Sequence, residues 1–219
     1  MGLEKKIKEA MLPQGISKTI GLRELLVDYK EGGIALPPSF DYSWGIEQAS
    51  NFIASVILGA PIAPMVLYEG RPKKFFVIDG GHRLITLFSF YTGKWFNEQG
   101  LGAIAQINKT PLSNSYKRET EMRRVLTQPD LYDEFKLRLT PNHVLNGSGF
   151  LDLPDSTKHY FSKSELPFCF FVSCPAKESE VIIEVFSAIK LGEGLVKTEI
   201  DQLMKIKNSL VGLGQAREK

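Results

Sequence analysis

The sequence predicts an α+β fold, and three observations carry that prediction. Residues 63–68 and 74–78 are apolar runs of strand length, separated by a turn that contains glycine and proline. Residues 45–58 repeat apolar side chains at helical spacing. The motif Asp-Gly-Gly-His-Arg at 79–83 then joins the second apolar run to another segment with helical spacing.

The first half of the chain is expected to consist of short elements separated by glycine and proline. Residues 3–12 and 20–29 favour short helices, and the pairs Gly32-Gly33 and Pro37-Pro38 interrupt the chain after the second of them. The helix after the Asp-Gly-Gly-His-Arg motif is expected to end near Thr92 and Gly93. The buried stripe of the 45–58 helix is expected to comprise Ile46, Ala49, Ile53, Val56 and Ile57.

The second half of the chain permits two arrangements of domains. One has a core at 1–110 and a mostly helical extension at 111–219 that returns the strand at 166–173 to the core. The other is a single continuous domain. The extension is predicted to contain helices at 116–126, 129–139, 178–189 and 197–210, a loop at 141–155 and a strand at 166–173.

The composition is that of an ordinary globular protein of 219 residues, with 43% hydrophobic and 24% charged residues. A net charge of +2 is too small to indicate a nucleic-acid or membrane partner by itself. The sequence contains no apolar run of the ~20 residues that span a bilayer and no signal-peptide core at its start. The spacing of Cys169 and Cys174 suggests neither a disulfide framework nor a zinc site. We therefore expect a cytoplasmic protein without a membrane partner; its oligomeric state stays open.

The motif at 79–83 has the properties of a phosphate site. The backbone N–H groups in the first turn of a helix lack partners within the helix and favour anions. Gly80 and Gly81 permit positive φ and a close approach of backbone to a ligand. His82 and Arg83 add side-chain donors for phosphate oxygens. Asp79 adds a carboxylate suited to a metal ion, a water molecule or the arginine.

Simpler interpretations of the same residues stay open. A lone histidine at a helix start is also typical of a helix cap or a packing residue, although the adjacent Arg83 and the two glycines favour a functional role for His82. Arg83 can pair with Asp79 as a purely structural clamp. The 45–58 helix carries polar residues on one face beside its apolar stripe. If that face lies opposite the motif, it completes a phosphate pocket; otherwise it is a solvated edge. The polar residues on this face are Gln48, Asn51 and Ser55.

The motif at 79–83 resembles the DGxxR/GxHR signature of the ParB/sulfiredoxin superfamily. It is more similar still to the DGQQR motif in the N-terminal domain of GmrSD-type restriction proteins. Residues 40–44 and 53–62 are similar to that family's QRxYxW … LIxSILxGxPI opening, and residues 84–94 continue the likeness. Residues 184–195 resemble its IFxxINxxGxxL element.

The resemblance implies a compact core with a small mixed sheet and surrounding helices, in which the strand-to-helix motif binds phosphate. Members of the family bind or hydrolyse nucleoside triphosphates, and some cut or nick DNA, often in defence against phage. The resemblance implies a central site formed by Asp79, Gly80, His82 and Arg83, with Gln48, Asn51 and Ser55 on a facing helix.

Four positions depart from the family's pattern. Phe40 replaces the arginine before the aromatic segment, which removes one cationic contact, and Lys190 replaces an asparagine. Gly81 and His82 replace the two glutamines of DGQQR. Gly81 also occupies the position of the reactive cysteine of sulfiredoxin, so sulfiredoxin chemistry is not expected. These departures leave open an altered or lost activity.

The sequence favours a hydrolase that binds and hydrolyses a nucleoside triphosphate in a DNA-related or phage-defence setting. Arg83 and the helix start would stabilise negative charge on phosphate oxygens. Asp79 would hold Mg²⁺ or position water, and His82 would act as a donor or general acid–base. In this hypothesis the phosphate-binding residues are Gly80, Gly81, His82, Arg83, Gln48, Asn51 and Ser55.

Two alternatives remain. A metal-dependent DNA nuclease or nickase needs several carboxylates, and Asp41 and Glu47 are the nearest helpers to Asp79 in this hypothesis. A non-catalytic module would bind DNA or a nucleotide without turnover. For DNA, the candidate contacts are the cations of the 116–126 and 129–139 segments, although interleaved acids also fit a solvated face. Those cations are Lys117, Arg118, Arg123, Arg124, Lys136 and Arg138.

Overall fold

The computed structural model describes residues 15–37, 40–71 and 73–172, and it confirms the α+β fold. A mixed sheet of five strands has the order β1-β7-β3-β4-β2, and a second sheet pairs β5 with β6. The strands are β1 (Gly15–Gly21), β2 (Ile34–Ala35), β3 (Met65–Arg71), β4 (Lys74–Asp79), β5 (Lys94–Phe96), β6 (Tyr132–Glu134) and β7 (Glu165–Val172).

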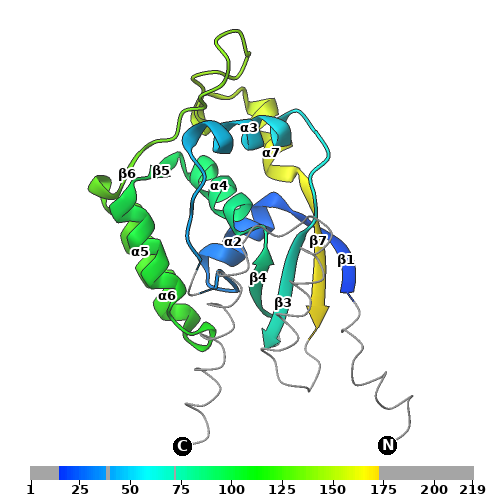
Figure 1. Cartoon of the computed structure of the whole chain (residues 1–219), viewed down its shortest axis with the longest axis vertical. Helices are drawn as coiled ribbons and strands as arrows, with labels where there is room; N and C mark the ends of the chain where they lie inside the picture. Colours follow the sequence, from blue (N-terminus) through cyan, green and yellow to red (C-terminus); the bar gives the residue numbers. More distant parts are fainter. Residues whose placement is uncertain (1–14, 38–39, 72, 173–219) are drawn as a thin grey trace, which may run out of the picture.

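Strand β7 joins the two ends of the described chain in one sheet. It pairs antiparallel with β1, where Gly15 lies opposite Phe171, and parallel with β3, where Met65 lies opposite Phe168. Beyond β3, the sheet continues through antiparallel β4 to parallel β2. Figure 1 shows the late strand β7 between the early strands β1 and β3. Strand β1 therefore depends on β7 for its pairing, and β3 depends on β7 along one of its two edges.

Helix α4 lies at the centre of the core and follows β4 after a single residue, Gly80. Its residues Leu84, Leu87 and Phe90 are 0–1% exposed, and Phe90 makes edge contacts with Phe135 and Phe161. Helices α5 and α6 flank the core on one side, and α3 and α7 lie beyond the end of the sheet (Figure 1). The helices are α2 (Leu22–Lys30), α3 (Ile46–Ile57), α4 (Gly81–Thr92), α5 (Glu98–Asn108), α6 (Ser115–Thr127) and α7 (Asp155–Lys163).

Most predictions with a clear hydrophobic period are confirmed. The helices expected at 45–58 and 116–126 are α3 and α6, and the strand expected at 166–173 is β7. The apolar stripe of α3 is buried except for Ile46, which is half-buried. The helix expected at 20–29 begins two residues later, because Ile20 and Gly21 pair with β7.

The helix predicted at 129–139 is wrong. Pro129–Leu131 form one 3₁₀ turn, Tyr132–Glu134 form β6, and extended chain follows. Phe135 and Leu137 are buried while Lys136 between them contacts acids at the surface, so the apolar period here is two residues. The abundance of charged residues favoured a helix, and tertiary burial of alternate residues overrode it.

Several elements were not predicted. Strand β1 lacks a continuous apolar run, and α5 contains two glycines, which disfavour a helix. One of them, Gly100, is required because a Cβ there would lie 2.0 Å from the carbonyl oxygen of Leu131. Strands β5 and β6 and helix α7 are short. The 141–155 segment is largely irregular, as expected, apart from a 3₁₀ turn at Phe150–Asp152.

Other predictions lie outside the described residues. They include the helices at 3–12, 178–189 and 197–210, and the positions of Cys174 and Lys190. Within the described ranges, none of the helices has both the length and the apolar character that crossing a membrane requires.

Candidate functional site

The strand, glycine turn and helix predicted at 79–83 are present. Strand β4 ends at Asp79, Gly80 adopts φ +97° in the left-handed region, and α4 begins at Gly81. The first hydrogen bond within the helix runs from Leu84 N–H to the Gly80 carbonyl oxygen (2.9 Å). The N–H groups of residues 81–83 precede that bond and carry the positive end of the helix dipole.

Both glycines of the motif are closely packed. A Cβ at Gly80 would lie 2.4 Å from Met65 Cγ. A Cβ at Gly81 would lie 2.4 Å from Phe40 Cε2 and 2.9 Å from Leu36 Cδ2. Both residues are buried. Glycine is therefore required here by neighbouring side chains, and at Gly80 by backbone conformation as well.

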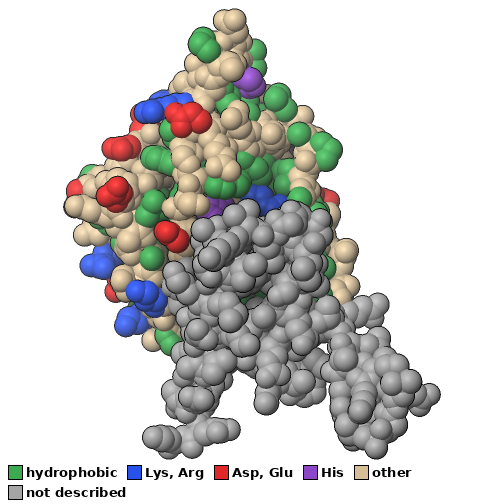
Figure 2. Space-filling model, in the orientation of Figure 1, with side chains coloured by type: hydrophobic (Ala, Val, Ile, Leu, Met, Phe, Trp, Pro, Cys, Tyr) green, Lys and Arg blue, Asp and Glu red, His purple; other side chains and the backbone are tan. Residues whose placement is uncertain are grey.

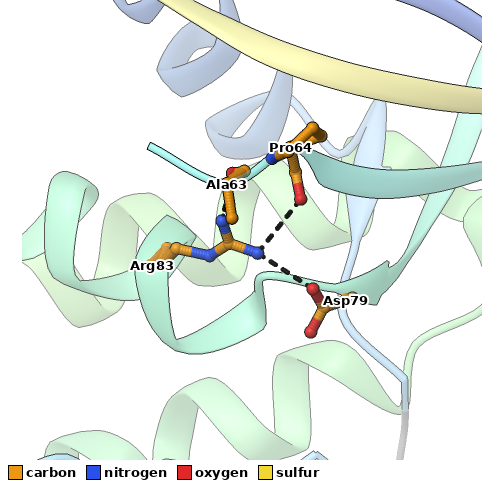
Figure 3. A network of polar contacts seen from close by, with 4 residues as sticks. All are labelled: Ala63, Pro64, Asp79 and Arg83. Atoms are coloured by element: carbon orange, nitrogen blue, oxygen red, sulfur yellow. Dashed lines mark hydrogen bonds and ion pairs between the residues drawn. The ribbon is translucent and has the colours of Figure 1, made fainter. Parts of the chain in front are cut away.

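Arg83 forms a clamp between α4 and the chain that leads into β3. Its Nη2 donates to Asp79 Oδ2 (2.9 Å) and to the Pro64 carbonyl oxygen (3.2 Å), and its Nη1 donates to the Ala63 carbonyl oxygen. Figure 3 shows the guanidinium group between these acceptors. The side chains of Arg83 and Asp79 are only 14% and 29% exposed. The pairing proposed as a structural clamp is thus present.

His82 lies against the aromatic segment at 40–44. Its Nε2 accepts a hydrogen bond from Ser43 N–H (3.2 Å) and lies 3.0 Å from Ser43 Oγ. The ring of Trp44 stacks on the imidazole at a centroid distance of 5.6 Å, and Phe40 contacts it edge-on at 5.0 Å. Because an N–H can donate only to an unprotonated nitrogen, this contact requires Nε2 to be unprotonated.

Tyr42 fixes the same segment to the next turn of α4. Its hydroxyl lies 2.7 Å from Thr86 Oγ1, and its ring contacts both His82 and Trp95. Burial raises the pKa of Tyr42 to about 12, so the phenol is neutral at physiological pH. The aromatic segment and the glycine motif, far apart in the sequence, therefore form one cluster.

The three polar residues predicted on the facing helix all lie on α3. Gln48 and Asn51 are exposed, and Ser55 is half-buried with its hydroxyl donating to the Asn51 carbonyl oxygen (2.9 Å). Among the described residues, no hydrogen bond joins any of the three to Asp79. Their part in phosphate binding stays a prediction.

Among the described residues, Asp79 is the carboxylate that bonds to Arg83 of the motif. Asp79 Oδ2 is bonded to Arg83, while Oδ1 makes no hydrogen bond within the described ranges. In the same part of the chain, no group of three or more His, Cys, Asp or Glu side chains is arranged to hold a metal ion. Mg²⁺ bound with a nucleotide takes most of its ligands from phosphates and water, so one carboxylate suits it. A site with two metal ions would need more.

The cations proposed as DNA contacts are largely engaged within the protein. On α6, Arg123 pairs with Glu119 (2.5 Å) and Arg124 with Glu121 (2.8 Å), whereas Arg118 is 2% exposed. Lys136 and Arg138 lie outside any helix, contrary to the prediction, and Lys136 pairs with Glu134 and Asp152. Figure 2 shows basic and acidic side chains intermixed along this flank. The arrangement is that of a solvated face.

The pairing of Arg83 with Asp79 was anticipated from the sequence, but the other partners of Arg83 and those of His82 were not. Ser43 contributes its backbone N–H, and Ala63 and Pro64 contribute carbonyl oxygens, so none of these contacts depends on side-chain identity. The only available signal was the resemblance that places the aromatic segment at 40–44 in the same family pattern as the glycine motif.

Comparison with known proteins places the chain in a family. The family model described as GmrSD restriction endonuclease, N-terminal domain, matches residues 22–205, which is most of the chain and includes the aromatic segment and the motif at 79–83. No curated protein and no solved structure gave a match. The chain therefore belongs to the family of GmrSD restriction endonuclease N-terminal domains.

Proposed function

We propose that this protein acts in a restriction system directed at foreign DNA and that the start of α4 binds the phosphates of a nucleoside triphosphate. The family supports the setting. The junction at Asp79, Gly80 and α4 carries the proposal for the ligand, because it presents helix N–H groups beside a carboxylate and a guanidinium group.

The same residues suit hydrolysis better than DNA cleavage. Asp79 Oδ1 would hold Mg²⁺ on a bound nucleotide or orient the attacking water. Arg83 would stabilise charge on phosphate oxygens while it holds the start of α4 in place. A nuclease with two metal ions would require carboxylates that the described residues do not bring together.

His82 is proposed as a positioning residue. Its Nε2 accepts from Ser43 N–H, and transfer of a proton through that atom would break this hydrogen bond. Its ring is packed among Phe40, Tyr42 and Trp44. His82 would act by holding the aromatic segment against the first turn of α4.

Nucleotide binding is tested by thermal unfolding with ATP, GTP, CTP or UTP, each with and without Mg²⁺. A ligand at about 100 times its Kd stabilises the native state by roughly 2.7 kcal/mol, which raises the melting temperature of a chain of this size by roughly 5–10 °C. Hydrolysis is measured in parallel as release of inorganic phosphate. Asp79→Asn keeps a side-chain oxygen as acceptor for Arg83 but removes the negative charge. We therefore expect this variant to lose the Mg²⁺-dependent part of the rise in melting temperature, and to lose phosphate release as well.

Asp155→Asn is the matched control, because Asp155 lies on α7 and its side chain is fully exposed. It should behave as the unmodified protein does. The absence of a shift with every nucleotide would refute the proposal, as would phosphate release that Asp79→Asn leaves unchanged.

His82→Gln separates positioning from proton transfer. A glutamine amide oxygen can accept from Ser43 N–H, and the related motif carries glutamine at this position, so we expect the nucleotide-induced shift and the turnover to fall by no more than a few-fold. Loss of a general acid–base would instead lower kcat by roughly 10²–10⁴. Leucine has no hydrogen-bond acceptor, so His82→Leu should lose both the nucleotide-induced shift and the turnover.

A second candidate is a non-catalytic module that binds the nucleotide without turnover. One observation favours it: the ring of Phe40, which replaces the family's arginine, packs directly on Gly81. A nucleotide-induced shift without phosphate release would identify this case. If DNA is the ligand instead, phosphate contacts would make its binding fall steeply with added salt.

A further inference from the structure

Arg118 is a buried cation that has no anionic partner among the described residues. It lies on α6 and is 2% exposed, and no described carboxylate forms an ion pair with it. Its helix neighbours Arg123 and Arg124, which do have carboxylate partners, are exposed. A charge removed from water is strongly unfavourable unless it is paired and hydrogen-bonded, so this site requires compensation.

The contacts that Arg118 makes compensate it only in part. Nη1 donates to the Thr110 carbonyl oxygen (3.2 Å) and Nη2 to Asn108 Oδ1 (3.4 Å). Both acceptors are neutral and lie at the carboxyl end of α5, where the helix dipole gives some further support. Arg118 Nε is buried and has no partner among the described residues.

Two further polar atoms in the same region are buried and lack partners within the described ranges. They are Asn108 Nδ2, on the side chain that already contacts Arg118, and the hydroxyl of Tyr29 on α2. Burial raises the pKa of Tyr29 well above its ordinary value, and the nearby Arg118 opposes that rise. The phenol is therefore neutral and able to donate.

The turn at Gly32 packs against α6 beside Arg118. Gly32 has φ +76°, and a Cβ there would lie 3.3 Å from Arg118 Cβ and 3.3 Å from the Ser115 carbonyl oxygen. This close approach places the turn after α2 against the base of the Arg118 side chain. The three buried polar atoms lie on α2, α5 and α6.

We propose that Arg118 Nε, Asn108 Nδ2 and the Tyr29 hydroxyl bind a small inorganic anion, such as chloride or phosphate, inside the protein. All three groups can donate, and none has an acceptor among the described residues. Water could satisfy the donors but not the guanidinium charge. A small anion satisfies both, and the burial of all three donors favours a small ion over an organic one.

The test measures thermal unfolding at constant pH and ionic strength, with sodium gluconate replaced stepwise by sodium chloride or by sodium phosphate. We expect the melting temperature to rise by several degrees as the fitting anion saturates the site. The anion that acts at the lower concentration is the ligand. Equal melting temperatures in all three salts would overturn the proposal.

Asn108→Asp supplies a carboxylate beside Arg118 in place of the anion. We expect this variant to melt higher than the unmodified protein in gluconate and to lose the anion response. Asn146→Asp is the matched control: Asn146 is exposed, its Oδ1 also accepts one hydrogen bond, and the response should be kept. An anion response that persists undiminished in Asn108→Asp would show a general salt effect and overturn the proposal.

If Asn108→Asp does not fold, a direct measurement on the unmodified protein still tests the proposal. Bromide replaces chloride in crystals of the unmodified protein, and its anomalous signal locates the ion. We expect a peak bordered by Arg118 Nε, Asn108 Nδ2 and the Tyr29 hydroxyl. A map with no peak there, in crystals grown with bromide or with phosphate, would exclude the site.

Discussion

Gly80→Ala is expected to lower the free energy of unfolding by about 3 kcal/mol. Two costs add: the left-handed conformation at φ +97° disfavours any L side chain by about 1–2 kcal/mol, and the new methyl group would lie 2.4 Å from Met65 Cγ, which overpacks the site by a further ~1–3 kcal/mol. Urea-induced unfolding followed by circular dichroism measures the loss.

Gly93→Ala provides the matched control for this substitution. Gly93 ends α4 with φ +71°, and a Cβ there meets nothing within 4 Å, so it carries the conformational cost alone. We expect a loss of about 1 kcal/mol. Equal losses at the two positions would show that the contact with Met65 relaxes freely and that packing does not require glycine at the turn.

Arg83→Met is expected to destabilise the protein by about 2–3 kcal/mol, a fall in melting temperature of roughly 4–12 °C. Methionine keeps most of the apolar stem but leaves the carbonyl oxygens of Ala63 and Pro64 and the carboxylate of Asp79 without their donor. Partial exposure of Asp79 keeps the loss below that of a fully buried pair. The variant should also lose the nucleotide-induced shift.

Arg123→Met isolates the effect of burial. Arg123 pairs with Glu119 at the same i,i+4 spacing, but its side chain is 67% exposed. Exposed pairs of this kind contribute less than ~0.5 kcal/mol. A comparable loss of stability in the two variants would mean that the hydrogen bonds from Arg83 to the backbone carbonyl groups contribute little. That result would contradict a role for Arg83 as a structural clamp.

The features predicted from sequence are those that depend on local chemistry. The succession of strand, glycine turn and helix at 79–83 follows from an apolar run, two glycines and renewed helical spacing, and the structure confirms it. The buried stripe of α3 follows from periodicity in the same way. The resemblance to the family was drawn from the same motif together with the aromatic segment at 40–44, and the family model that matches residues 22–205 confirms it.

The features that were missed depend on contacts between distant segments. Helix α5 forms despite Gly100, whose missing side chain admits the Leu131 carbonyl oxygen. Phe135 and Leu137 are buried by tertiary packing on an extended chain that charged residues made resemble a helix. At the site, the carbonyl oxygens that hold Arg83 have no signature in the sequence, because every residue carries one.

The position of β7 has a consequence for how the chain reaches this fold. Strands β1 and β3 flank β7 and share no ladder with each other, so the sheet cannot be completed before Glu165–Val172 has left the ribosome. Until then β3 presents an unpaired edge, which is a template for association with other chains. The pairing of Gly15 with Phe171 also joins residues far apart in the chain, and long-range pairing of this kind slows folding. Translation that stops before β7 would therefore yield an aggregation-prone fragment.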